Sequence, residues 1–108
     1  MSESYEVLII DMFRYDPDED YVVVGFPTLE LAKEFARRWV RDSVEELREP
    51  GQSPEELRSR WFIFGEDASV LRGEPHYAGS HELDFFIAHP ATPEERDWQA
   101  VKRLAGVR

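Results

Sequence analysis

Cysteine is absent from this chain of 108 residues, and its absence excludes several kinds of chemistry. A disulfide framework, a thiolate zinc site and a catalytic thiol all require this residue. A chain without cysteine suits a reducing compartment, and we therefore expect a cytoplasmic protein. Lysine is nearly absent too, since Lys33 and Lys102 are the only lysines among the 13 basic residues.

Long apolar runs are also missing. The first one, residues 7–10, is far too short for the apolar region of a signal peptide, and the residues before it carry no basic side chain. No apolar stretch approaches the roughly 20 residues that a membrane-spanning helix needs. We therefore expect a soluble protein with no membrane partner.

Basic residues are outnumbered by acidic ones, 13 to 23, so that the formal net charge is −10. Residues 1–27 contain seven acidic residues and one basic residue, whereas residues 28–60 contain eight acidic and seven basic residues. An acidic field of this strength repels phosphate backbones. We therefore expect no nucleic-acid partner.

Motifs of the common enzyme classes are absent as well. The sequence has no Gly-x-Ser-x-Gly nucleophile elbow and no glycine-rich loop for a phosphate group. Residues 16–20 offer alternate oxygen ligands, as a calcium loop does, but Tyr21 and Pro27 stand where such a loop needs glycine and glutamate. We assign no catalytic residue, no metal site and no cofactor, and leave open whether the protein is an enzyme.

Hydrophobic residues make up 42% of the chain and aromatic residues 13%, as in a globular protein, and the length fits one domain over residues 1–108. Residues 5–10 and 21–26 are rich in β-branched side chains and predict two strands. The turn-forming residues 16–20 between them predict a hairpin.

The strongest helical pattern covers residues 28–48. Thr28 is suited to cap its N-terminus, and the Glu-Pro-Gly segment at 49–51 ends it. A broad stripe along one side collects the mainly apolar positions, which are Leu29, Ala32, Phe35, Ala36, Trp39, Val40, Ser43 and Leu47. We therefore expect this apolar side of the helix to pack against a sheet.

Two further helices are predicted from their N-terminal capping patterns. Ser53 begins a short one that ends near residue 59, and Thr92 begins a longer one that starts at Pro93 and stops at Gly106.

Residues 61–64 and 83–88 are short apolar runs and predict two more strands, whereas residues 68–71 fit a short return strand or an irregular segment. The predicted order is β-β-α-(short α)-β-(β)-β-α. It implies an α+β domain with a mostly antiparallel sheet of about four strands and two main helices on one face.

Two groups of side chains are candidates for ligand binding. The loop 72–82 concentrates hydrogen-bonding side chains, and its His76, Tyr77 and His81 predict a site for a small ligand or a reaction. On the long helix, Arg37, Arg38 and Arg41 suit an anion or an acidic partner. However, Glu34, Asp42 and Glu45 lie at i,i+4 spacing from them, which favours a solvent face neutralised by ion pairs.

Aromatic residues supply the leading hypothesis. Trp61 and Phe62 are consecutive, as are Phe85 and Phe86, so in strands their rings point to opposite faces of the sheet. An uncovered aromatic face is typical of an interface with a second copy or another protein. We therefore expect a non-catalytic interaction or regulatory module that meets a protein partner or itself. The alternative is a small-ligand-binding protein or enzyme with its site at loop 72–82.

Overall fold

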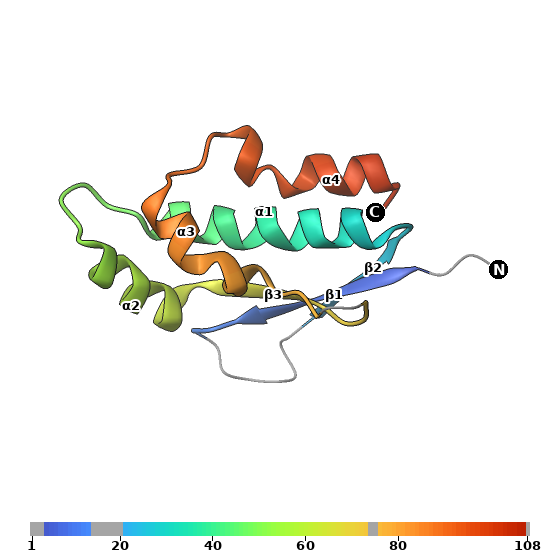
Figure 1. Ribbon diagram of the computed structural model, residues 1–108, viewed down its shortest axis with the longest axis horizontal. Helices are drawn as coiled ribbons and strands as arrows, with labels where there is room; N and C mark the ends of the chain where they lie inside the picture. Colours follow the sequence, from blue (N-terminus) through green and yellow to red (C-terminus); the bar gives the residue numbers. More distant parts are fainter. Residues whose placement is uncertain (1–3, 14–20, 74–75, 108) are drawn as a thin grey trace.

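A three-stranded antiparallel sheet and four helices form one α+β domain in the computed structural model, which describes residues 4–13, 21–73 and 76–107 (Figure 1). The chain runs in the order β-β-α-α-β-α-α. The strands are β1 (Tyr5–Asp11), β2 (Tyr21–Phe26) and β3 (Glu66–Val70). The helices are α1 (Leu29–Leu47), α2 (Pro54–Phe64), α3 (Leu83–Ala88) and α4 (Trp98–Ala105), with single 3₁₀ turns at Gly79–Glu82 and Glu94–Arg96.

The strand β1 lies at the centre of the sheet, in the order β2-β1-β3. Val7 pairs with Val23 on one side and Val70 on the other, and its side chain is fully buried. Because side chains alternate along a strand, Leu8 and its partner Val22 point to the opposite face. The predicted antiparallel pairing of residues 5–10 with 21–26 is confirmed, whereas the predicted turn at 16–20 lies outside the described residues.

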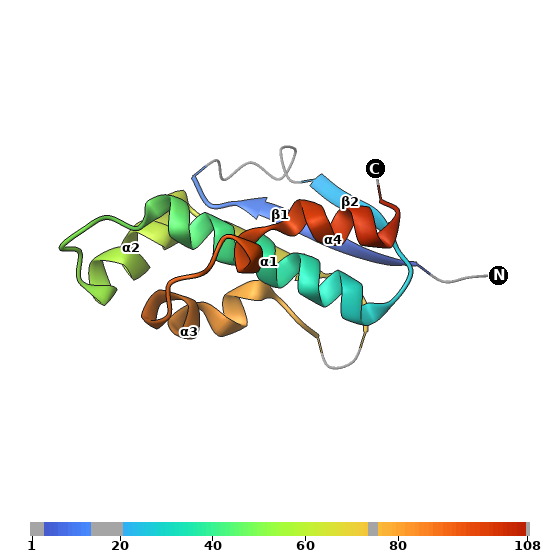
Figure 2. The same ribbon diagram turned by 90° about the horizontal axis from the view of Figure 1, so that it is seen from above.

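The helix α1 organises the core. The Thr28 side chain accepts a hydrogen bond from the Leu31 amide at 3.1 Å, which caps the helix as predicted. The apolar side of α1 buries Phe35, Ala36 and Val40. Figure 2 shows α1 lying along the sheet with α3 on one flank and α4 on the other. Of the two predicted main helices, α1 packs directly on the sheet and α4 packs mainly on α1.

The strand predictions for residues 61–64 and 83–88 are wrong, because both segments are helical. The helix that Ser53 caps does not stop near residue 59 but continues to Phe64. Its buried residues Leu57 and Trp61 are four apart, which is the spacing of one helix side. In α3 the buried residues Leu83, Phe86 and Ile87 have the same helical spacing. A short, dense apolar run fits both the period of a strand and the period of a helix. The burial of residues on one side of the segment shows which of the two it adopts.

Of the segment left open at 68–71, residues 68–70 belong to β3, which pairs with β1 and gives a sheet of three strands rather than about four. The predicted helix from Pro93 is divided. Thr92 and Glu95 form the expected reciprocal cap, but it closes a single 3₁₀ turn. Asp97 then accepts a hydrogen bond from the Ala100 amide at 3.0 Å and begins α4. In the part of the chain that the structure describes, no helix is long and apolar enough to cross a membrane.

Candidate cation-binding pocket

A cavity of about 360 Å³ opens between the sheet, α1 and α4, close to the ends of β1 and β3. α1 contributes Trp39, Asp42, Ser43 and Glu46, whose spacing of three, four and seven residues from Trp39 places them on one side of the helix. The other elements contribute Ile9, Asp11, Tyr21, Glu66 and Trp98.

Three aromatic side chains form the walls of this pocket. The rings of Trp39 and Trp98 lie with their centroids 4.5 Å apart at an angle of 46°. Tyr21 meets Trp39 edge-on at 6.2 Å, and Phe35 packs behind both indoles in the core. The faces of such rings carry partial negative charge, which attracts cations.

Four carboxylates, from Asp11, Asp42, Glu46 and Glu66, share the pocket with these rings. Asp11 and Glu66 are direct partners in the register of β1 and β3, so two like charges face each other across the sheet. Among the described residues that line the cavity there is no lysine, arginine or histidine. The lining therefore combines negative charge with aromatic surface.

Hydrogen bonds from the indoles orient two of the carboxylates. Trp39 Nε1 donates to Glu66 Oε1 at 3.0 Å, and Trp98 Nε1 donates to Asp42 Oδ2 at 3.3 Å. Arg96, from the turn before α4, binds the other oxygen of Asp42 at 2.7 Å. This arginine neutralises Asp42, and its charge also acts to lower the pKa of Glu46, against the raising effects described below.

The pKa values within the pocket rise together. Partial burial raises the pKa of Glu66, against the lowering effect of the Trp39 hydrogen bond and with further repulsion from Asp11, Glu46 and Asp42. Burial and then repulsion from Asp42 raise the pKa of Glu46. Burial and then Glu66 raise the pKa of Tyr21. Each shift disfavours a further negative charge, and a bound positive charge would relieve all three.

The aromatic and acidic lining is suited to an organic cation. Within the described ranges, no group of three or more histidine, aspartate or glutamate side chains is placed to hold a metal. A second, more open cavity of about 580 Å³ shares Asp42 and Trp98 with the first and continues along the segment that leads into α4.

The predicted loop residues His76, Tyr77 and His81 do lie together, since the ring centroids of His76 and Tyr77 are each 6.0 Å from that of His81. Each of the three side chains has a polar partner within the protein. His76 Nε2 lies 3.2 Å from the Ser69 hydroxyl, His81 Nδ1 accepts from the Ala78 amide at 3.4 Å, and the Tyr77 hydroxyl donates to Glu82. These contacts favour an anchoring role, and the ligand site at this loop stays a prediction.

The four aromatic residues predicted as an interface divide between core and surface. Trp61 and Phe86 are buried, whereas Phe62 and Phe85 are about half exposed. All four lie on helices, so the argument from opposite faces of a strand does not apply to them. An interface role for Phe62 and Phe85 stays a prediction.

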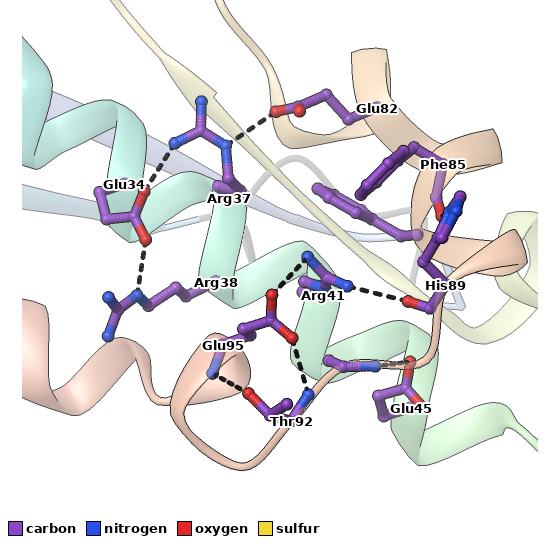
Figure 3. A network of polar contacts seen from close by, with 12 residues as sticks. Glu34, Arg37, Arg38, Arg41, Glu45, Glu82, Phe85, His89, Thr92 and Glu95 are labelled. Atoms are coloured by element: carbon purple, nitrogen blue, oxygen red, sulfur yellow. Dashed lines mark hydrogen bonds and ion pairs between the residues drawn. The ribbon is translucent and has the colours of Figure 1, made fainter.

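Most arginines of α1 take part in a polar network with the residues just before and just after α3 (Figure 3). Arg37 bridges Glu34 and Glu82 at 2.6 and 2.9 Å, and Arg38 binds Glu34 at 2.7 Å. Arg41 is buried and donates to the His89 carbonyl oxygen at 2.8 Å.

The pairs expected within α1 are only partly found. Glu34 binds Arg38 as expected, whereas Arg41 lies 3.4 Å from Glu95, beyond the helix. The expected partners Asp42 and Glu45 bind Arg96 and Arg48 respectively. The arginines therefore tie α1 to the 3₁₀ turn before α3, to the residue that follows α3 and to the segment before α4, as Figure 3 shows for Arg37 and Arg41.

The sequence alone did not reveal the pocket. Trp39 belongs to the apolar stripe predicted for the long helix, and the predictions single out no role for Trp98. The available signal was the position of Asp42 and Glu46 one and two turns after Trp39, which adds acidic groups beside an aromatic one. The Asp11–Glu66 pair depends on the strand register and has no local signal.

Comparison with known proteins finds no matching family model, no matching curated protein and no matching solved structure. The function is therefore inferred from the geometry and electrostatics of the pocket.

Proposed function

We propose that the protein is a non-catalytic interaction module that binds the positively charged side chain of a protein partner in the pocket lined by Trp39, Trp98 and Tyr21. One observation carries the proposal: an aromatic-walled cavity holds four carboxylates, of which Asp42 is paired with Arg96, and no basic side chain is among its described lining residues. A guanidinium or ammonium group gains from both features, since it stacks on indole faces and pairs with carboxylates.

The raised pKa values support the same reading. Glu46 and Glu66 repel each other and their acidic neighbours when the pocket is empty. Each cation–π contact stabilises a bound cation by about 0.5–2 kcal/mol, and solvent screens the partly exposed ion pairs. We therefore expect a Kd on the order of 0.1–1 mM for a single side-chain analogue, and tighter binding for a longer partner.

The test is a titration of the full chain with N-acetyl-arginine methylamide, followed by amide and indole NMR shifts. N-acetyl-citrulline methylamide is the matched neutral probe, because it has the same shape without the charge. We expect the indole signals of Trp39 and Trp98 to shift with arginine and to stay in place with citrulline. Equal shifts with both probes, or none with either, would contradict the proposal.

Variants locate the binding site. Glu66→Gln and Glu46→Gln each remove one pocket charge, and we expect each to weaken arginine binding about threefold to tenfold. Glu55→Gln removes the same charge from the exposed start of α2 and serves as the control, with unchanged affinity expected. Loss of affinity in the control as large as in Glu66→Gln would mean that overall charge, and not the pocket, attracts the probe.

Self-association is a second candidate, supported by exposed aromatic residues outside the pocket. The ring centroids of Phe13 and Phe64 are 5.2 Å apart, and these side chains are 63% and 45% exposed. Phe62 and Phe85 are about half exposed. Light scattering at several concentrations tests it, and a constant monomer mass would exclude it.

We assign both activities to the cytoplasm because the chain carries no cysteine.

A further inference from the structure

The strand β2 forms one edge of the sheet, and its outer side has no strand partner among the described residues. The opposite edge, β3, is engaged: the Val70 amide donates to the Tyr77 carbonyl oxygen at 2.9 Å, and Ser69 forms a bridge with Ala78. An unpaired edge presents a row of backbone donors and acceptors to which another extended segment can add.

The first residues of β2 lack the charges and prolines that protect many edges, and the register irregularity between β1 and β2 begins only after Val23. Its sequence, Tyr-Val-Val-Val-Gly-Phe, has no charged residue and no proline. Tyr21, Val22 and Val24 are 49%, 40% and 56% exposed. Near the end of the strand, the Val107 side chain lies 3.8 Å from the position of a Cβ on Gly25, so the accessible stretch is the first four residues.

This stretch leads directly to the pocket. Tyr21, the first residue of β2, is one wall of the cavity and touches Trp39. In an added strand, the residue opposite Tyr21 would point to the same face of the sheet as Tyr21 does. Its side chain would therefore lie at the mouth of the pocket, while its neighbours would lie beside Val22 on the open face.

Charge decides between the possible occupants of this edge. Residues 1–27, which contain β1 and β2, carry seven acidic residues and one basic residue, and the whole chain has a net charge of −10. Pairing β2 with β2 of a second copy would bring two such regions together and is opposed by their repulsion. A basic segment is attracted by the same field.

We propose that β2 is the docking edge for an extended basic segment of another protein, which adds a fourth strand and places one arginine or lysine side chain in the pocket. This inference rests on the proposed function, because the pocket supplies the charge recognition. Backbone pairing along β2 supplies the additional affinity and fixes the direction of the segment.

The test uses an eight-residue peptide of alternating valine and threonine with one central arginine, titrated into the full chain by calorimetry. Two further versions carry N-methyl groups on alternate backbone amides, one on each edge of the peptide. We expect the parent peptide to bind at least tenfold more tightly than N-acetyl-arginine methylamide. One N-methylated version should lose this gain, and the other should keep it, because only one edge of the peptide faces β2.

Each of the other outcomes refutes one part of the proposal. Equal affinity of both N-methylated peptides with the parent would refute strand addition while leaving the pocket function intact. Binding of neither the peptide nor the arginine probe would refute the pocket function itself. A citrulline version of the peptide that binds as tightly as the parent would refute the insertion of a cation. A stable dimer that buries β2 would replace the basic partner with a second copy.

Discussion

At the scale of single residues, Trp61 shows how one buried side chain joins two helices. Its ring is fully buried, and its Nε1 donates to Ser43 Oγ on α1 at 2.8 Å. We expect Trp61→Phe to lower the free energy of unfolding by about 2 kcal/mol, because it removes ring volume and leaves a buried hydroxyl with fewer partners. Urea unfolding followed by circular dichroism measures the change.

The neighbouring residue provides the control for Trp61. Phe62 is half exposed on the other side of α2, and we expect Phe62→Leu to change the free energy of unfolding by less than about 0.5 kcal/mol. Equal effects of the two substitutions would mean that Trp61 is not part of the contact between α1 and α2.

Glu66 is expected to trade stability for binding. Its pKa is raised in the folded protein, so its stabilising contribution is present at low pH and is lost as the pH rises through that pKa. At pH 7 the charged form repels its acidic neighbours, and we expect Glu66→Gln to stabilise the protein by about 0.5 kcal/mol, allowing for screening by solvent. Unfolding midpoints at pH 7 and pH 4 measure this, and a gain that persists at pH 4 would point to a cause other than charge.

At the scale of elements, a close contact joins the 3₁₀ turn Gly79–Glu82 to α1. A Cβ on Gly79 would lie 2.3 Å from Val40 Cγ2 and 2.9 Å from the Ala36 carbonyl oxygen. We expect Gly79→Ala to cost about 2 kcal/mol through overpacking. In a Val40→Ala background the added methyl group has more room, so the cost should fall by about 1 kcal/mol. Strictly additive effects in this double-mutant cycle would contradict the contact.

The same scale shows what sequence patterns predict well. The helix of residues 28–48 was found because one continuous stripe, from Ala32 to Leu47, excludes any other period. The runs at 61–64 and 83–88 were misassigned because four to six consecutive apolar residues fit a strand and a buried helix equally. The spacing of Leu57 and Trp61 reveals the helix, but only when both are read as one segment.

The pocket was beyond prediction for a different reason. The residues that line it come from five separate elements. Two of its carboxylates, Asp11 and Glu66, are far apart in the sequence and are brought together by strand pairing. The α+β class and the β1–β2 pairing follow from local patterns. Contacts between residues far apart in the sequence, such as Asp11 and Glu66, depend on the packing of the whole chain, which local patterns do not encode.

At the scale of the whole molecule, the acidic residues predict a stability maximum below neutral pH. The raised pKa values of Glu46 and Glu66 mean that stability rises as the pH falls from 8 through their folded pKa values. The pKa of Glu82 is lowered, since hydrogen bonds from Tyr77 and Arg37 outweigh its burial. Its stabilising contribution is therefore lost when the pH falls further, through that lowered pKa.

Urea midpoints measured between pH 8 and pH 3 would show this maximum. We expect the rise on its alkaline side to flatten in 0.5 M salt, because salt screens repulsion between exposed carboxylates. A midpoint that falls steadily from pH 8 downward would contradict the role assigned to Glu46 and Glu66.

The position of β1 has a consequence for the order of events during synthesis. β1 precedes the other two strands of the sheet in the sequence, yet Val7 pairs with Val70, and Asp11 faces Glu66. On the ribosome the central strand can pair with β2 early, but its other edge has to wait for β3. Trp98, which forms one wall of the pocket, is made after all three strands. On our proposal, a partner therefore binds at this pocket only after Trp98 has been made and α4 has packed on α1.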